Sequence, residues 1–129
     1  MRQQFTQIGT LTALLDDSET APALGTGQPV SVAVESLSGP LKVITCPDFD
    51  VPHFVIGARP ASSTSSGIIT PISAGVPILL GGAVMRGDKL MVESGRFVKA
   101  TTGKVVICAA GDAGASGDTI RAALLSEVA

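Results

Sequence analysis

The sequence is informative first through what it lacks. It contains no tryptophan, no tyrosine and no asparagine, and aromatic residues make up only 3% of its 129 residues. Without asparagine the chain offers no acceptor for N-glycosylation. Without large aromatic side chains its core must be built from valine, isoleucine, leucine and alanine, which dominate the composition. Such a core favours thin β layers over aromatic-lined pockets.

Histidine and cysteine are almost as rare. The chain has one histidine, His53, and two cysteines, Cys46 and Cys108. This set does not supply the four ligands of an ordinary zinc site. Both cysteines lie in apolar segments, so we expect buried thiols that pack as small hydrophobic residues. A disulfide between them stays open as the alternative.

Strong charge and long apolar runs are also missing. A net charge of -2 gives no general attraction to nucleic acid or to membranes. Polar residues follow Met1, where a signal peptide would have an apolar run. The most apolar window, residues 75–84, is too short to span a bilayer and contains Pro77. We therefore expect a soluble chain of one-domain size, made in a cytoplasm.

Motifs of nucleotide-binding and hydrolytic sites fail at their decisive positions. The glycine-rich segment 111–119 has Asp118 where a P-loop needs lysine. The same aspartate stands where a nucleophile elbow over 114–118 would need glycine. After Gly25-Thr26-Gly27, Val30 occupies the place of the third glycine of a dinucleotide fingerprint.

The remaining candidate chemistry centres on His53. This histidine could form a triad-like or ligand-binding site with Asp48 or Asp50, and the two carboxylates could contribute to a divalent-cation site. The plainer interpretation is a surface histidine with loop carboxylates nearby by chance. We expect no catalytic residue, no metal and no cofactor.

The second part of the chain predicts mainly β structure. Alternating residues over 88–93, a turn at Ser94-Gly95 and a strand over 97–100 predict a hairpin. A turn at Thr102-Gly103 leads into a buried strand over 105–110. Further strands are expected over residues 30–34, 41–45, 53–58, 68–72, 76–80 and 119–125, with loops over 47–52, 60–67 and 111–118. This pattern predicts a small antiparallel β-sandwich or barrel-like domain, with no internal repeat.

Residues 1–29 look different and predict an extended N-terminal arm and linker ahead of a β domain over 30–129. Large apolar residues recur at helical spacing, acidic residues follow, and proline and glycine interrupt residues 21–29. Because exposed tails seldom carry so many large apolar side chains, we expect the arm to place them on a partner; a frayed terminus is the plainer alternative. The expected contact residues are Phe5, Ile8, Leu11 and Leu15.

Basic residues gather around the predicted hairpin. A solvated sheet face is the plain interpretation, and a docking surface for an acidic partner, including another copy of the chain, is the functional one. Nucleic acid is a weaker option because only Phe97 could stack on a base. The candidate docking residues are Arg86, Lys89, Arg96 and Lys99.

Four segments near the end of the chain form a connected pattern. They are GDKLMVE at 87–93, GRFVKA at 95–100, VVICA at 105–109 and DTI at 118–120, the last after a glycine-rich loop. Together they resemble the capsid decoration, or cement, proteins of tailed bacteriophages. The likeness covers roughly the last third to half of the chain, and the first forty residues do not align.

The resemblance implies a small β protein, without catalytic residues, that binds the outer surface of a phage head and stabilises its lattice. Its partners would be the major capsid protein and other copies of itself in a homotrimer, with no direct contact to nucleic acid or membrane. It would reside on the virion after synthesis in the bacterial cytoplasm. The alternative is another virion module, such as a tail or adhesin β domain.

Overall fold

The chain is built from short β-strands. A computed structural model describes residues 11–16, 24–33, 41–62 and 64–124, and these ranges contain ten strands and no helix. The strands are β1 (Leu11–Leu15), β2 (Pro29–Val32), β3 (Lys42–Thr45), β4 (Phe54–Ile56), β5 (Gly67–Thr70), β6 (Pro77–Leu79), β7 (Lys89–Glu93), β8 (Arg96–Lys99), β9 (Cys108–Ala110) and β10 (Thr119–Ala123). The prediction of a mainly β fold is confirmed. In these ranges no helix is long and apolar enough to cross a membrane.

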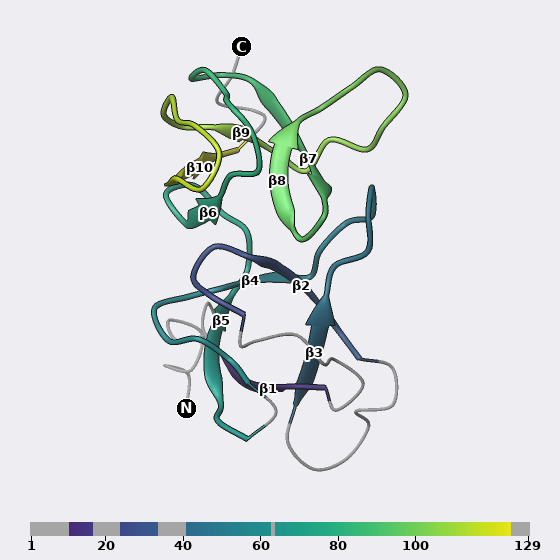
Figure 1. The fold of residues 1–129 in the computed structure, drawn as a ribbon, viewed down its shortest axis with the longest axis vertical. Coiled ribbons are helices and arrows are strands. Elements are labelled where there is room, and N and C mark those ends of the chain that lie inside the picture. Colours follow the sequence, from purple (N-terminus) through teal and green to yellow (C-terminus); the bar gives the residue numbers. More distant parts are fainter. Residues whose placement is uncertain (1–10, 17–23, 34–40, 63, 125–129) are drawn as a thin grey trace, which may run out of the picture.

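The strands form two units that follow one another along the long axis of the molecule (Figure 1). The first is a closed barrel in the order β1-β3-β2-β4-β5, and the second is a five-stranded sheet in the order β6-β10-β9-β7-β8. The pairings are antiparallel except for β1 with β3. The outer strands of the second sheet also approach each other, since the Gly81 N–H donates to the Phe97 carbonyl at 2.9 Å.

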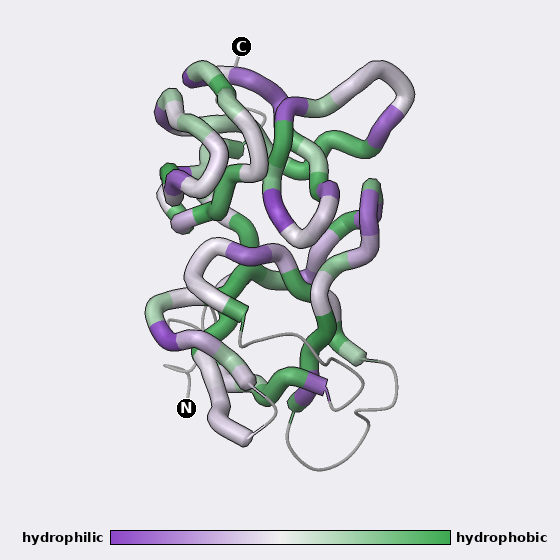
Figure 2. The backbone as a smooth tube through the Cα atoms, in the orientation of Figure 1, coloured by the Kyte–Doolittle hydropathy of each residue, from purple (hydrophilic) through white to green (hydrophobic). Residues whose placement is uncertain are grey.

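The interior is packed with small branched side chains, as the composition predicts. One cluster fills the barrel and the other fills the second sheet, and the tube in Figure 2 shows apolar segments running through both units. The second cluster also includes Cys46 and Val55 from the barrel side, while Phe97 is fully buried within it. The core of the second sheet therefore reaches into the junction with the barrel, while the barrel keeps a core cluster of its own.

The prediction of an extended N-terminal arm and linker over residues 1–29 is wrong for residues 11–16 and 24–29, which belong to the barrel. Strand β1 pairs with β3 and β5, and Leu15 is only 2% exposed in the barrel core. Leu24 is buried too, and residues 24–29 lead directly into β2. The error has a physical cause: Leu11 and Leu15 are four residues apart, a spacing that fits one face of a helix and equally one face of a strand.

The strand expected over residues 105–110 is also shorter than predicted. Only Cys108–Ala110 form β9, and Val105 is 48% exposed. Just before β9 the Ile107 N–H still donates to the Leu90 carbonyl at 2.8 Å, and the chain ahead of it makes a different contact. The Lys104 ammonium lies 4.2 Å from the centre of the Phe49 ring, which gives a cation–π interaction with the loop that follows β3.

One type of turn recurs before three strands. Residues 25–28, 85–88 and 115–118 each have glycine in third place, with φ of 88°, 93° and 90°. The side-chain oxygen of the fourth residue accepts a hydrogen bond from the first N–H, at 2.7, 2.9 and 2.9 Å. Glycine takes this conformation without steric cost, and the side chain in fourth place closes the turn.

Two of these turns belong to an internal repeat that the sequence analysis missed. Segments 80–92 and 110–122 lie thirty positions apart, and their backbones cross where Val84 and Gly114 exchange hydrogen bonds of 2.9 and 3.1 Å. They share identical residues only at Gly81 and Gly111, Ala83 and Ala113, Gly87 and Gly117, and Asp88 and Asp118. These matches are glycines and turn residues, so they resemble ordinary loop composition in a single sequence.

The barrel and the second sheet are fastened at Gly27. The Leu79 N–H donates to the Gly27 carbonyl at 3.0 Å, and the Gly27 N–H donates to the Ile56 carbonyl at 2.8 Å. A Cβ atom on Gly27 would lie 2.6 Å from the Leu79 nitrogen. A second tie lies near β7, where the Ser94 N–H donates to Asp48 Oδ1 at 2.8 Å.

We expect Gly27→Ala to be strongly destabilising. Gly75→Ala is the matched control, because Gly75 has a similar φ of +86° but no atom within 4 Å of an added Cβ. The control should cost about 1–2 kcal/mol for the left-handed backbone alone, and Gly27→Ala should cost about 2 kcal/mol more because it overpacks the junction. Urea unfolding of both variants measures the difference; equal losses would show that the junction is not tightly packed.

Candidate interaction surface

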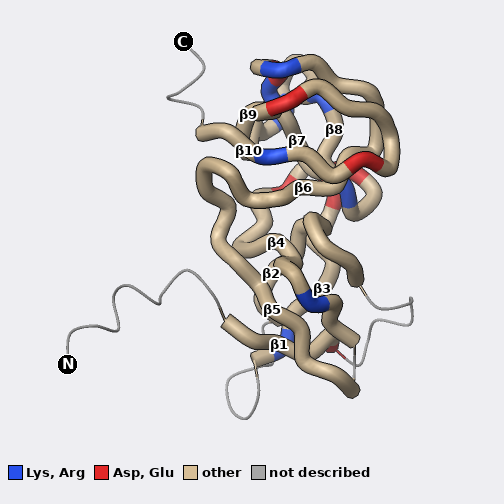
Figure 3. Tube along the Cα trace, turned by 90° about the vertical axis from the view of Figure 1, so that its left-hand side faces the viewer, with Lys and Arg blue, Asp and Glu red and all other residues tan. Residues whose placement is uncertain are grey.

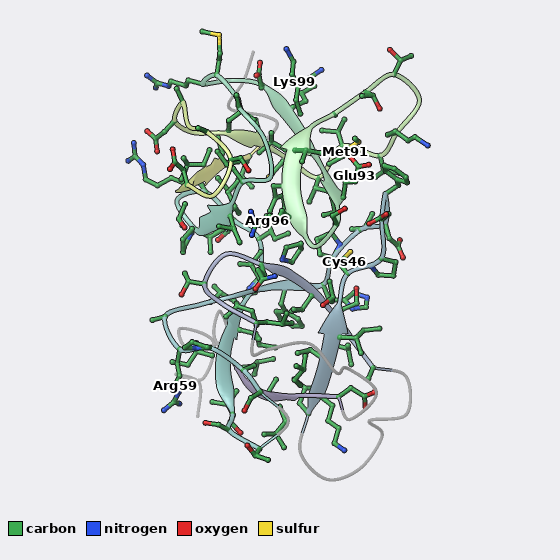
Figure 4. All side chains as sticks on the ribbon, in the orientation of Figure 1. Cys46, Arg59, Met91, Glu93, Arg96 and Lys99 are labelled. Atoms are coloured by element: carbon green, nitrogen blue, oxygen red, sulfur yellow. The ribbon has the colours of Figure 1, made fainter. Side chains whose placement is uncertain are left out.

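Three of the four predicted docking residues lie together at the end of the second sheet away from the barrel. Arg86 is in the turn before β7, and Lys89 begins that strand. Lys99 ends β8, with its ammonium 4.0 Å from Asp88 Oδ2. Figure 3 shows basic segments at this end, and Figure 4 places Lys99 there. We call Met85, Arg86, Lys89 and Lys99 the distal basic face.

Arg96 does not belong to this face. It lies opposite Glu93 in the register of the β7–β8 hairpin, beside the turn that contacts the barrel. Figure 4 shows it at the junction of the two units. There it borders a hollow of about 320 Å³ with Glu93 and Val98. The expected single group of four cations is therefore divided, because Arg96 and Lys99 stand at opposite ends of β8.

Asp88 organises the distal basic face. Its carboxylate accepts the Met85 N–H at 2.9 Å and lies within ion-pair distance of Lys99. The closed turn presents Met85, which is 71% exposed, together with the exposed Arg86. Within the described part of the chain, no ion pair holds Arg86 or Lys89 to a carboxylate.

A hollow of about 460 Å³ adjoins the face. Two arginines, Arg86 and Arg121, line it, and its other lining residues are all glycine or alanine. Arg121 is already engaged, since its Nη2 and Nε donate to the two carboxylate oxygens of Asp112 at 2.8 and 3.0 Å. Arg86, which no ion pair holds in the described ranges, is the other positive charge of the hollow, and its field also helps to lower the pKa of Asp112.

Met85, Arg121 and this hollow could not be recognised as parts of a surface from the sequence alone. The hollow has no motif, because its walls come from two turns and from β9 and β10. Alanine and glycine carry no chemical signal in a sequence. The one sign of this surface in the sequence is the turn at residues 85–88, where Met85 and Arg86 are adjacent and both are exposed.

The expected arm contacts have a different outcome. Leu11 is 44% exposed at the start of β1, but Leu15 is buried in the barrel and is not available to a partner. Phe5 and Ile8 lie outside the described residues. The proposal of an apolar contact through the N-terminal segment therefore stands only for Phe5, Ile8 and Leu11.

His53 and its neighbouring carboxylates have separate structural partners. His53 Nδ1 accepts the Val32 N–H at 2.9 Å, and Asp50 Oδ1 accepts the Val51 N–H at 2.8 Å. Asp48 closes the junction through Ser94. No hydrogen bond or ion pair joins His53 to Asp48 or Asp50 in the described ranges, and no three potential metal ligands cluster there. The geometry supplies no nucleophile–base pair at His53.

The two cysteines are free and buried rather than joined in a disulfide. Burial raises the pKa of the Cys108 thiol to about 12, and burial likewise raises the pKa of Cys46. The thiolate is the reactive form of cysteine. Neither sulfur therefore has the character of a nucleophile or of a redox site.

We expect both thiols to resist a thiol-directed reagent at pH 8 in the folded protein and to react promptly in denaturant. Counting modified cysteines by mass spectrometry tests this. Rapid reaction of the native protein would contradict the packing, and Cys108→Ala gives the matched single-thiol variant for assigning any reaction that occurs.

A second prediction concerns acid. The bidentate hydrogen bonds from Arg121 lower the pKa of Asp112 to about 2. The ion pair should therefore persist well below pH 4 and be lost as pH falls through about 2, because a carboxylate with a lowered pKa contributes only while ionised. Its effect on stability should be small at this exposed site.

Carboxyl NMR shifts of Asp112 measure this titration directly. In Arg121→Met the pKa of Asp112 should return toward its ordinary value. An unchanged titration of Asp112 in the variant would show that Arg121 is not the cause.

Comparison with known proteins gives one informative result. No protein-family model matches the sequence, and no curated protein matches it. Among solved structures, the fold is similar to the head fiber gp8.5 N base of bacteriophage phi29, with a TM-score of 0.70 and 12% sequence identity. The match covers 89% of this chain and 92% of that one. At this identity the likeness shows a shared fold.

Proposed function

We propose that this chain is a structural protein of a bacteriophage virion that binds the outer surface of the head and stabilises its lattice. The observation that carries the proposal is the fold match, which spans nearly all of both chains and involves the base of a phage head fiber. The resemblance of residues 87–120 to capsid decoration proteins points to the same place independently.

The construction of the molecule suits a mechanical role. The hydrogen bonds at Gly27 and Asp48, and the packing of Cys46 and Val55 against the second sheet, join the two units, and we expect them to move as one body. A stiff protein that contacts several capsid subunits loses little conformational freedom on binding. Linked contacts then raise the effective concentration of each one. Such a clamp requires no catalytic group, in keeping with the structural roles of His53 and its neighbours.

We further propose a homotrimer, with the major capsid protein as the partner and the bacterial cytoplasm as the place of synthesis. Copies related by a threefold axis would present three identical contacts to the lattice. A tail or adhesin module remains the alternative, and the head-fiber fold favours the head.

The test is co-sedimentation of the purified protein with heads and, separately, with tails of the phage that encodes it. We expect the protein to pellet with heads in a fixed ratio to capsid subunits and to raise the temperature at which heads release DNA. Sedimentation equilibrium of the free protein gives its oligomeric state. Binding to tails alone, or unchanged head stability, would contradict the proposal.

A further inference from the structure

We infer that the distal basic face is the end that meets the head, and that it docks on an acidic protein surface whose carboxylate enters the hollow beside Arg86. This inference rests on the proposed function for the identity of the partner. It adds which end of the molecule makes the contact and what chemistry the contacted surface must have.

Charge is distributed unevenly over the molecule. Arg86, Lys89 and Lys99 with Asp88 give this end two more positive than negative charges, whereas the whole chain has a net charge of -2. The remainder of the protein is therefore acidic. An end of opposite sign orients the molecule as it approaches a charged partner and disfavours the reverse orientation.

The distal basic face exposes side chains that are typical of protein interfaces. Methionine and arginine are enriched at protein interfaces relative to other surfaces, and Met85 is the most exposed large hydrophobic residue in the described ranges. The Asp88 carboxylate and the positive φ of Gly87 hold both Met85 and Arg86 in a closed turn. A preformed turn loses little entropy when it binds.

The hollow beside that turn has the size and charge to accept an acidic side chain. The glycine and alanine lining leaves about 460 Å³, which is room for a carboxylate side chain and associated water. Asp112 forms its ion pair with Arg121 and acts on Arg86 only through its field, so an incoming carboxylate would form its charge-assisted hydrogen bond with Arg86. The face has no aromatic side chain on which a base could stack, which favours an acidic protein over a nucleic acid.

The experiment compares two arginine reversals in binding to empty, nuclease-treated heads of the encoding phage. Arg86→Glu changes the distal basic face. Arg59→Glu makes the same change of charge on the barrel, at the other end of the molecule from Lys99 (Figure 4). Both arginines are exposed, so we expect unfolding midpoints close to that of the unchanged protein. Met85→Gln provides a second, uncharged variant of the face.

We expect Arg86→Glu to weaken head binding by about tenfold or more, since a like charge would meet the acidic surface, and Met85→Gln to weaken it by several-fold. Arg59→Glu should stay within about twofold of the unchanged protein. Binding of the unchanged protein should also weaken with added salt, and less steeply in Arg86→Glu.

The outcomes separate the inference from the proposed function. If the unchanged protein pellets with heads but Arg86→Glu and Met85→Gln bind equally well, the inference is overturned and the function stands. Loss in Arg59→Glu alone would assign docking to the barrel end and also overturn it. If the unchanged protein ignores heads, the proposed function fails and the inference fails with it. If Arg86→Glu does not fold, the inference is decided by comparing the head binding of Met85→Gln with that of Arg59→Glu.

Discussion

The fold depends on glycines that hold the backbone at positive φ where two segments must touch. Gly27 is the clearest case, because its carbonyl receives a hydrogen bond from β6 and its missing Cβ leaves room for Leu79. Gly87 and Gly117 close equivalent turns ahead of β7 and β10. With few aromatic side chains to anchor a core, close backbone approach brings the two β units together and supplies the packing that large rings give elsewhere.

The same turns connect stability with the proposed contact. The turn that starts β7 closes through Asp88, and closure of this turn exposes Met85 and Arg86 beside the hollow. Asp118 closes its counterpart in the repeat, but Ser116 stands where the first turn has Arg86. The two turns thus share a backbone conformation but expose different side chains. We assign the turn with Met85 and Arg86 to the contact with the capsid.

Much of the fold could be predicted from local patterns. The hairpin of β7 and β8 follows from alternation and the Ser94-Gly95 turn, and both turn residues have positive φ. The patterns failed where one spacing fits two structures, as with Leu11 and Leu15, or where β-branched residues stay outside a strand, as with Val105 ahead of β9. The grouping of Arg86, Lys89 and Lys99 could be predicted from the basic residues around the hairpin, and its role in docking stays a proposal. The separation of Arg96 and the presence of the hollow depended on which ends of the strands meet.

The sequence by itself determined a β protein with a core of small branched residues, apolar segments around both cysteines and the β7–β8 hairpin. These properties are local or compositional, so each is written in neighbouring residues. Only the tertiary structure decided that β1 closes a barrel, that two segments thirty residues apart cross as a repeat, and that Arg86, Lys89 and Lys99 form one face without Arg96. Those outcomes depend on pairings between distant strands, whose partners and register a single sequence does not specify.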